Sequence, residues 1–432
     1  MRLRHLRDSR HNVLLGNVAA RVAALVCVFG ATLMLARNSG PAAVGVYALL
    51  HVLPGLVGTI ASSGLPVATP YFLAGPDRDD PRLPSTLVAI AIVGGTVGAA
   101  LWIVSAPLTG PLVFSDLPQR LVMLAGVAVL SRLIVITAKA CSQGSDDLAG
   151  SNAIIFTEQF MFLPAYASLW ALGVTGFAAV VGALLLADSL TASFAWTRLA
   201  RRHFFRRITR PSPLLARRIA SYGLRGQVGG VMSLLNLRLD FILLSVLAGP
   251  AVLGVYAVAS KFAELIRILG MALQYVFYPA FAKEGRAQAA ERARKLIPKF
   301  GFVSASVLVP LWLAAGFVIP EFYGSDFASA VTPTRIILFG LALDGVAGVI
   351  TGFLYGVGRP GLNSLAMAAG LAMTVLLDLL LIPRFEAVGA AIASAVAYTT
   401  TAFALVTFFW WVSRSSRRSA LDQPALASAD MH

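Results

Sequence analysis

The sequence predicts an all-α polytopic membrane protein with about 12 transmembrane helices, arranged as two parallel six-helix repeats around a central cavity. Three observations support this fold class. Of the 432 residues, 58% are hydrophobic and only 13% are charged, whereas a soluble protein is about one quarter charged. The apolar residues form runs long enough to cross a bilayer, which takes about 20 residues per helix. A nine-residue phrase also occurs twice.

The apolar runs predict twelve transmembrane spans. They cover residues 13–36, 43–73, 84–106, 121–138, 152–172, 177–197, 219–248, 251–281, 300–319, 336–356, 362–382 and 387–412. The first run follows a basic start and is too long for the apolar core of an ordinary signal peptide, so we interpret it as a retained helix. The second and the eighth are long enough to tilt or to extend beyond the membrane.

The repeated phrase is GPAAVGVYA at Gly40–Ala48 and GPAVLGVYA at Gly249–Ala257. The two copies are 209 residues apart and agree at seven of nine positions. Duplication of this size in a membrane protein indicates a transporter. Pro suits the first turn of a helix, where its missing N–H would have no partner. We therefore interpret the phrase as a helix start with close-packing glycines and assign it no ligand role.

Lys and Arg are unevenly distributed between alternate loops. With the N-terminus inside, the inner segments hold 25 of them and the outer segments only four, namely Arg37, Arg120, Arg335 and Arg384. This bias predicts that both termini are cytoplasmic. Since each half has an even number of spans, the two repeats are expected to be parallel. The predicted boundaries are 1–200 for an N-terminal lobe, 201–218 for a basic cytoplasmic linker, 219–413 for a C-terminal lobe and 414–432 for a disordered cytoplasmic tail.

Composition excludes several classes of function. The formal charge of +15 lies mainly between apolar runs, where basic residues set topology and contact membrane lipids, so we expect no nucleic-acid partner. Two cysteines, Cys27 and Cys141, provide neither a disulfide framework nor a metal site. No catalytic motif is found and the longest predicted outer loops have only about 15 residues. We therefore predict no enzymatic activity, no metal and no cofactor.

Twelve charged residues lie inside the predicted spans, where a charge is costly and usually faces a cavity or a partner. Spans 13–36, 43–73, 219–248 and 251–281 carry the repeat and a net charge of +3. The other eight spans carry a net charge of −3, with Arg132 against Glu158, Asp188, Asp344 and Asp378. The repeat-bearing spans are therefore expected to line an anion-accepting cavity. Their cationic residues are Arg21, Arg225, Arg238, Lys261 and Arg267.

The span 251–281 is the most densely charged. Lys261, Glu264 and Arg267 are spaced three apart, so Glu264 can neighbour both cations. Either this cluster neutralises itself, or its excess cation binds a phosphate. Arg238 and Asp240 are two apart and are not expected to pair. Snorkelling toward the cytoplasmic end is an alternative explanation for Arg225.

The intramembrane acids have two open interpretations. Asp344 and Asp378 are candidates for proton or sodium sites, because intramembrane carboxylates serve that purpose in transporters. Each is equally well explained as a hydrogen-bonded structural Asp. Asp240 and Glu264 are grouped with them as candidates for ion coupling or ion pairing.

Several stretches together resemble the polysaccharide (O-antigen) flippase family of the multidrug/oligosaccharidyl-lipid/polysaccharide exporter superfamily. They are ARNSGPAAVGVYALL, SSGLPVATPYFLA, the long segment from SYGLRGQVGG to YPAFAK, FYGSDFASAV, LYGVGRPGLNS and LIPRFEAVGAAIASAVAY. The resemblance implies two six-helix lobes that open alternately to each side of a bacterial inner membrane. It implies a polyprenyl-diphosphate-linked glycan as cargo for surface polysaccharide or lipopolysaccharide synthesis. The five cations named above would then meet the diphosphate.

The resemblance leaves other functions open. They are an ion-coupled exporter of drugs or metabolites, a peptidoglycan-precursor lipid flippase, and a membrane polymerase or ligase of the same sugar pathway. Short outer loops argue against the enzyme, and the cationic character of the repeat-bearing spans argues against the drug exporter. A polysaccharide polymerase is a possible protein partner under the flippase interpretation.

Overall fold

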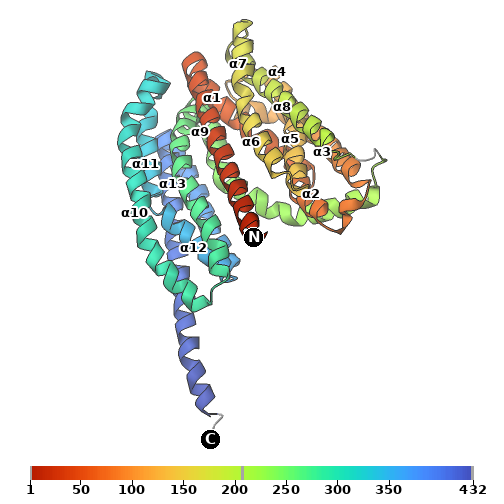
Figure 1. Cartoon of the computed structure of the whole chain (residues 1–432). Helices are drawn as coiled ribbons and strands as arrows, with labels where there is room; N and C mark the ends of the chain where they lie inside the picture. The colour runs from red at the N-terminus through yellow and green to blue at the C-terminus, as the bar shows by residue number, and fades with distance from the viewer. Residues whose placement is uncertain (1, 206–208, 430–432) are drawn as a thin grey trace. The chain divides into compact units, whose positions relative to one another are not determined.

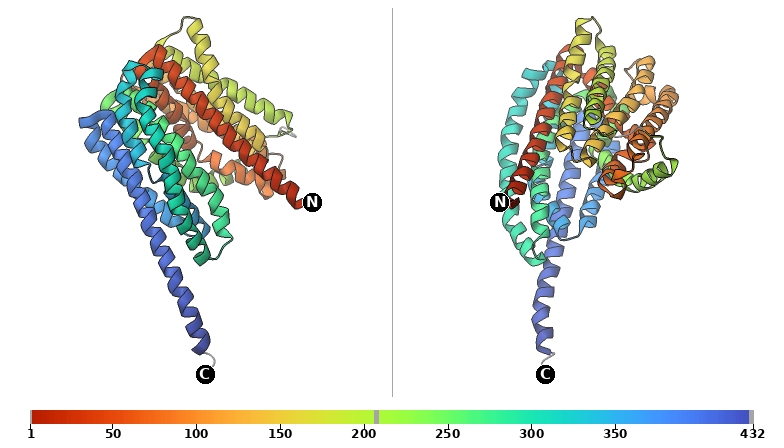
Figure 2. Two further views of the ribbon diagram at one scale, coloured as in Figure 1. Left: turned by 60° about the vertical axis from the view of Figure 1, so that its left-hand side comes forward. Right: turned by 45° about the vertical axis from the view of Figure 1, so that its right-hand side comes forward.

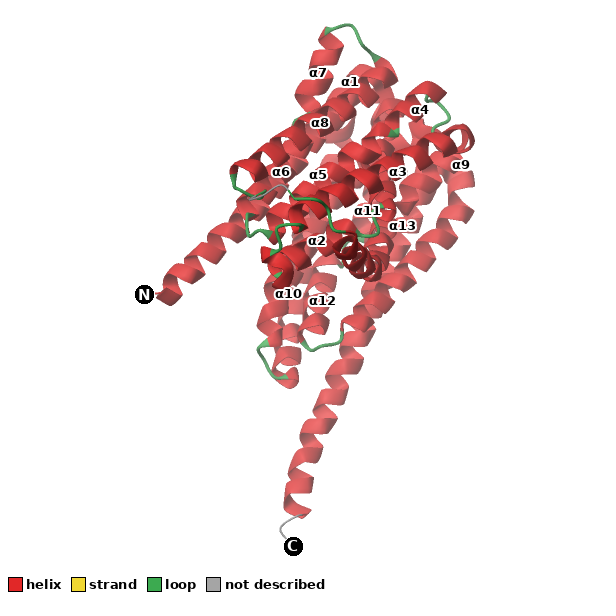
Figure 3. Ribbon diagram, turned by 90° about the vertical axis from the view of Figure 1, so that its right-hand side faces the viewer, coloured by secondary structure: helices red, strands yellow, loops and turns green. Residues whose placement is uncertain are grey.

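The computed structural model describes the backbone of residues 2–205 and 209–429. Side chains are described except at 1–15, 17–18, 76, 206–208, 225–226, 228–237, 275, 279 and 415–432. The described residues form helices joined by short loops and include no strand (Figure 1, Figure 3). They divide into two compact units, unit 1 (Met1–Gly254) and unit 2 (Val255–His432). The predicted all-α class is confirmed.

The helices of unit 1 are α1 (Arg2–Ala61), α2 (Leu65–Ala74), the short η1 (Pro76–Asp79), α3 (Leu83–Val113), α4 (Gln119–Ala125), α5 (Val127–Gly144), α6 (Leu148–Phe160), α7 (Phe162–Ala171) and α8 (Gly176–Arg201). Helix α9 (Pro213–Ala282) contributes to both units. Unit 2 continues with α10 (Arg286–Val318), the short η2 (Ile319–Tyr323) and η3 (Ser325–Ala330), α11 (Val331–Gly340), α12 (Asp344–Gly356) and α13 (Pro360–Ala429). Within each unit the helices form a bundle (Figure 2).

Three long helices each contain a break that separates two predicted spans. The backbone leaves helical geometry at Gly40 in α1, at Gly249 in α9 and at Glu386 in α13. Among the described residues, seven helices are long and apolar enough to cross a membrane, or eight if α11 and α12 form one span bent by 41°. The chain is therefore a polytopic membrane protein. The lobe, linker and tail boundaries drawn from the sequence stay a prediction.

The two copies of the repeated phrase start helical segments in the same way. Gly40 has φ 73° and Gly249 has φ 86°, the left-handed region in which glycine has no steric penalty. Each glycine breaks its helix, and the following proline begins the next segment. The interpretation of the phrase as a helix start is confirmed.

The later glycines of the phrase pack against the opposite copy. A Cβ on Gly45 would overlap the carbonyl oxygen of Pro250, and a Cβ on Gly254 would overlap that of Pro41. All four residues lie in unit 1. The two copies therefore make one reciprocal contact, in which each buries a glycine against the first turn of the other. Such close backbone approach requires small residues, as at other membrane helix pairs.

We expect Gly45→Ala and Gly254→Ala each to lower the yield of folded protein. The added methyl group meets a backbone carbonyl that cannot move aside as a side chain would, and overpacking of this kind costs about 1–3 kcal/mol. Fluorescence-detected size-exclusion chromatography with a thermal challenge measures the effect. Gly361→Ala is the matched control, because a Cβ there meets nothing within 4 Å. Equal melting of all three variants would contradict the reciprocal contact.

Four predicted spans are interrupted where the sequence suggested continuous helix, including 152–172 at Met161 and 336–356 between α11 and α12. In span 43–73, Ser63 and Gly64 have positive φ and separate α1 from α2. In the fourth span, Gly126 separates α4 from α5, and its N–H bonds Met123 O. The Val122 carbonyl thereby loses its usual helical donor and accepts instead from the Trp102 indole at 2.8 Å. A long-range hydrogen bond thus stabilises this break.

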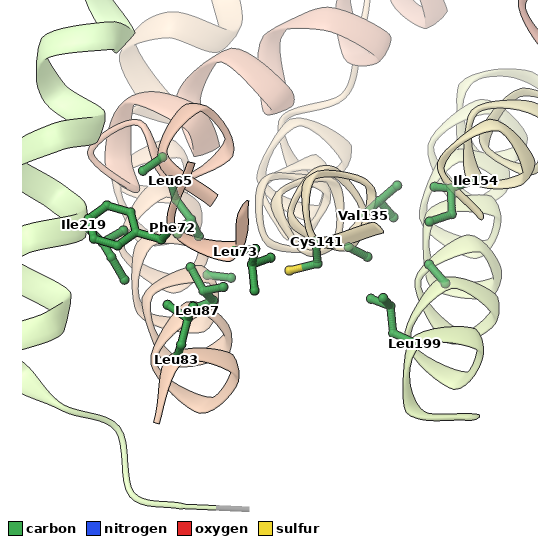
Figure 4. Packing of buried hydrophobic residues seen from close by; sticks show 14 of the residues in the cluster. Leu65, Phe72, Leu73, Leu83, Leu87, Val135, Cys141, Ile154, Leu199 and Ile219 are labelled. Atoms are coloured by element: carbon green, nitrogen blue, oxygen red, sulfur yellow. The ribbon is translucent and has the colours of Figure 1, made fainter. Parts of the chain in front are cut away.

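Each unit has its own apolar core. In unit 1, leucine, phenylalanine and isoleucine side chains from α2, α3, α5, α6, α8 and α9 meet, as Leu73, Leu87 and Cys141 illustrate (Figure 4). In unit 2 the core is aromatic, with Phe353 packed edge-on against both Phe281 and Phe409. Packing in these cores fixes the positions of the helices that carry the intramembrane charges described below.

Candidate functional site: intramembrane charges of the two units

Among the side chains that the structure describes in unit 1, the most deeply buried cation is Arg132 on α5, whose side chain is 4% exposed. Its Nη1 lies 2.8 Å from Glu158 Oε1 on α6. Its Nε lies 3.2 Å from Asp188 Oδ2 on α8. The three side chains come from three helices that pack together. Arg132 is therefore held by two carboxylates inside the membrane-spanning bundle.

Two further groups complete this cluster, which we call the Arg132 network. Lys139 Nζ lies 3.4 Å from Glu158 Oε2, and Arg132 Nη2 lies 3.0 Å from His51 Nδ1. A guanidinium only donates hydrogen bonds, so Nδ1 accepts and the imidazole is neutral with its proton on Nε2. The network of His51, Arg132, Lys139, Glu158 and Asp188 thus contains two cations and two carboxylates and is electrically balanced.

Arg132, Glu158 and Asp188 have no predicted site role, although all three are charges within predicted spans. Lys139 directly follows the predicted span 121–138, and the structure pairs it with Glu158. One signal was present in the sequence. Three consecutive spans carry one base and two acids, and His51 is the one histidine within a predicted span. Because a charge within a membrane span is costly without a partner, these residues are expected to pair with one another.

A second group of polar residues lies in unit 2, where a helix is broken. Helices α11 and α12 meet at 41°, and Asp344 is the first residue of α12. A carboxylate is stabilised there by the positive end of the helix dipole. Discontinuous helices of this kind often form the substrate and ion sites of transporters.

Asp344 is placed against α9. A Cβ on Gly270 would overlap the carboxylate of Asp344, and Arg267 lies one turn before Gly270 on α9. The Arg267 guanidinium also lies 5.4 Å from the ring centroid of Tyr398 on α13. The Arg267–Asp344 site therefore joins α9, α12 and α13. The structure brings together an anion-site candidate and an ion-coupling candidate that are 77 residues apart in the sequence.

A row of glycines allows this approach of α12 to α9. Gly348, Gly352 and Gly356 are spaced four apart and lie on one face of α12. A Cβ on Gly348 would overlap the Gly270 carbonyl, and one on Gly356 would lie 2.6 Å from Phe281 Cβ. Small residues at this spacing are typical of close helix pairs in membranes. The row keeps Asp344 within reach of Arg267.

The i, i+3 pair on α9 forms as its spacing predicts. Lys261 Nζ lies 3.1 Å from Glu264 Oε2, and both side chains are largely buried. Glu264 therefore pairs with Lys261, whereas the pairing of Glu264 with Arg267 that the self-neutralising interpretation also requires stays a prediction. An anion entering here would compete with Glu264 for Lys261.

The other predicted site residues lie on α1, α9 and α13. Arg21 is exposed on α1, and the Arg238 guanidinium lies 4.9 Å from the Phe241 ring centroid. Asp240 is buried and accepts a hydrogen bond from the Phe241 N–H at 2.9 Å. Asp378 is fully buried on α13. The side chain of Arg225 lies outside the described residues. Ligand roles for all of these residues stay predictions.

Outside the spans, Asp147 fixes the loop between α5 and α6. Its side chain accepts from the Gly150 N–H at 2.9 Å and from Arg198 at 3.1 Å, and Arg202 lies at 3.1 Å. Burial alone would raise the pKa of this carboxyl. Hydrogen bonds from Arg198 and Gly150, with the attraction of both arginines, instead hold its pKa below the usual value. Asp147 therefore ties α6 to the end of α8.

The lowered pKa of Asp147 predicts a pH-dependent contribution to stability. A depressed folded-state pKa stabilises the protein fully above the unfolded value, about pH 4, and this contribution is lost as pH falls through the folded value. We expect Asp147→Asn to lower the free energy of unfolding at pH 6 by about 1–2 kcal/mol, which is measured as a lower thermal midpoint. The difference from wild type should shrink below about pH 4. Asp146→Asn is the control, and a pH-independent difference would contradict the account.

A polytopic helical bundle with paired intramembrane charges and a broken helix has the features of a secondary transporter. Comparison with known proteins is consistent with this class of protein. Residues 34–332, more than half of the chain, match the family model described as "Polysaccharide biosynthesis protein". The protein belongs to this family, as the resemblance of its motifs indicated.

Individual relatives are more distant. An uncharacterized membrane protein of Methanocaldococcus jannaschii, MJ1068, is 23% identical over 189 residues. That match covers 43% of this chain, and the chain spans only 37% of the length of this curated relative.

Solved structures show the same fold over nearly the whole chain. The lipid II flippase MurJ in an inward closed conformation aligns with a TM-score of 0.70 and 12% identity, over 93% of this chain and 90% of its own. An inward-facing multidrug resistance MATE family transporter of the MOP superfamily aligns with a TM-score of 0.68 and 15% identity, over 92% and 96%. At these identities the likeness concerns the fold alone.

Proposed function

We propose that this protein is a flippase that moves a polyprenyl-diphosphate-linked oligosaccharide from the cytoplasmic to the outer leaflet by alternating access. Its membership of a polysaccharide biosynthesis family supports a glycan cargo. The observation that carries the proposal is the cationic character of the predicted spans within α1 and α9, with Arg21, Arg238, Lys261 and Arg267. Few groups other than a phosphate require several cations within membrane spans.

The Arg267–Asp344 site suggests how cargo and ions are coupled. Asp344 lies against Gly270, one turn from Arg267, so a diphosphate that binds Arg267 would approach this carboxylate. Protonation of Asp344, or its engagement by a cation, would remove the repulsion between the two anions. The same acid then serves as the coupling group. This role extends the sequence-based proposal of Asp344 as an ion site.

The topology follows the charge bias of the loops. We place the protein in a bacterial inner membrane with both termini in the cytoplasm, because the predicted spans put 25 loop and terminal Lys and Arg residues on one side and four on the other. A polysaccharide polymerase that consumes the flipped glycan is the expected protein partner. Transport rather than catalysis is the proposed activity.

Complementation tests the function. The protein is expressed in a bacterial strain that lacks its own polysaccharide flippase, and both surface glycan and accumulated lipid-linked intermediate are measured. We expect surface glycan to return and the intermediate to fall. Rescue of a lipid II flippase deletion instead would assign peptidoglycan precursor as cargo. Drug resistance without either rescue would assign an exporter.

A further inference from the structure

A pocket in unit 1 lies between the end of α2 and the first three turns of α9. These turns cross beneath α2 in Figure 1, where the start of α9 is light green. The cavity has a volume of about 460 Å³. Its lining combines aromatic, hydroxyl and charged side chains: Tyr71, Phe72, Asp77, Leu214, Arg217, Arg218, Ser221 and Tyr222. None of them belongs to the charged sites described above.

The pocket is built around a fixed guanidinium. Arg218 binds Asp77 through two hydrogen bonds, of 2.9 and 3.1 Å, and lies 5.8 Å from the Phe72 ring centroid. On the rim, the rings of Tyr71 and Tyr222 stack with centroids 4.2 Å apart. The α9 residues at this site therefore have a defined position relative to α2.

Arg217 provides the charge that remains. It is exposed and lines the pocket, and no acid of the described chain lies within ion-pair distance of it. Since Asp77 is engaged by Arg218, the pocket carries a net charge of +1. This balance matches an anion with one negative charge, such as a phosphodiester, and not a diphosphate.

The rim favours a lipid over a soluble anion. Leu214 is 73% exposed and Tyr71 is 53% exposed beside the cationic side chains. Exposed leucine and tyrosine next to arginine are typical of helices that lie at the membrane interface. The adjoining segment adds further basic residues, Arg201 and Arg202, which attract anionic lipid.

We propose that this pocket binds the phosphodiester headgroup of an anionic glycerophospholipid, with Arg217 as the phosphate ligand. The hydroxyl groups of Ser221 and Tyr222 line the same cavity and supply further donors. Bound lipid would hold the first turns of α9 against the bilayer surface. The site is independent of the glycan proposed as cargo.

Native mass spectrometry of the purified full-length protein tests this site. Phosphatidylglycerol and phosphatidylcholine are titrated separately into wild type, Arg217→Gln, Arg217→Lys and the control Arg210→Gln. We expect wild type to prefer phosphatidylglycerol. Arg217→Gln should weaken its binding about tenfold, the effect of one charge-assisted hydrogen bond. Arg217→Lys and Arg210→Gln should retain most of the affinity.

Three results would overturn the proposal. The first is equal binding of the two lipids by wild type. The second is equal weakening by Arg217→Gln and Arg210→Gln, which would indicate general attraction by the basic segment. The third is competition by polyprenyl diphosphate. If it displaces bound phosphatidylglycerol at a lower concentration than added phosphatidylglycerol does, the pocket is a cargo site. Failure of glycan complementation would leave all three lipid measurements unaffected.

Discussion

Arg132→Met is expected to destabilise the protein strongly. The substitution leaves Asp188 without a cationic partner and Glu158 with Lys139 alone, both inside the bundle. Removing one member of a buried ion pair costs about 3–5 kcal/mol, because the remaining charge stays desolvated. A thermal melt in detergent, followed by size-exclusion chromatography, measures the loss.

A second substitution separates charge from packing. Arg132→Met combined with Asp188→Asn leaves Lys139 and Glu158 as a balanced pair, so a large part of the stability should return. Arg120→Met is the control, because this arginine is exposed in the first turn of α4. A double variant that melts no higher than Arg132→Met would show that ion pairing does not explain the role of Arg132.

Arg21→Ala and Arg267→Ala are each expected to abolish glycan export without loss of folded protein. Under the proposed function both arginines bind the diphosphate, where a charge-assisted hydrogen bond contributes about 1.5–3 kcal/mol. Export is measured as surface glycan in the complemented strain, with the amount of folded protein measured in parallel. Lys283→Ala is the matched control, since Lys283 is exposed between α9 and α10.

The two variants also separate the roles of the two arginines. Arg267→Ala removes the cation one turn from the contact between Asp344 and Gly270, so the variant should also change the pH dependence of any residual export, whereas Arg21→Ala should not. Unchanged export in both single variants would contradict the assignment of an anion site to these helices.

The sequence predicted those features of the fold that depend on local chemistry. Hydropathy located the spans, and the Gly-Pro pair located the breaks at Gly40 and Gly249, because only glycine takes this backbone conformation without strain. The Lys261–Glu264 pair also followed from helical spacing. Each of these depends on residues a few positions apart.

Features that depend on tertiary register were not predicted. Arg132, Glu158 and Asp188 meet only because α5, α6 and α8 pack at one particular depth, and hydropathy does not specify that depth. The break at Gly126 depends on the indole of Trp102, 20 residues from the carbonyl that it binds. The approach of Asp344 to Arg267 requires the glycine row of α12. The four-residue spacing of these glycines is visible in the sequence, but it does not show that α9 is the helix packed against them.

Direct translocation by the purified protein tests the central claim. The protein is reconstituted in liposomes with a fluorescent polyprenyl-diphosphate-linked oligosaccharide, and a membrane-impermeant reagent quenches the molecules in the outer leaflet. We predict that wild type makes nearly all of the lipid-linked glycan accessible, while Arg267→Ala liposomes leave the inner half protected. Equal protection in wild-type and protein-free liposomes, under every ion and pH gradient applied, would contradict the flippase assignment.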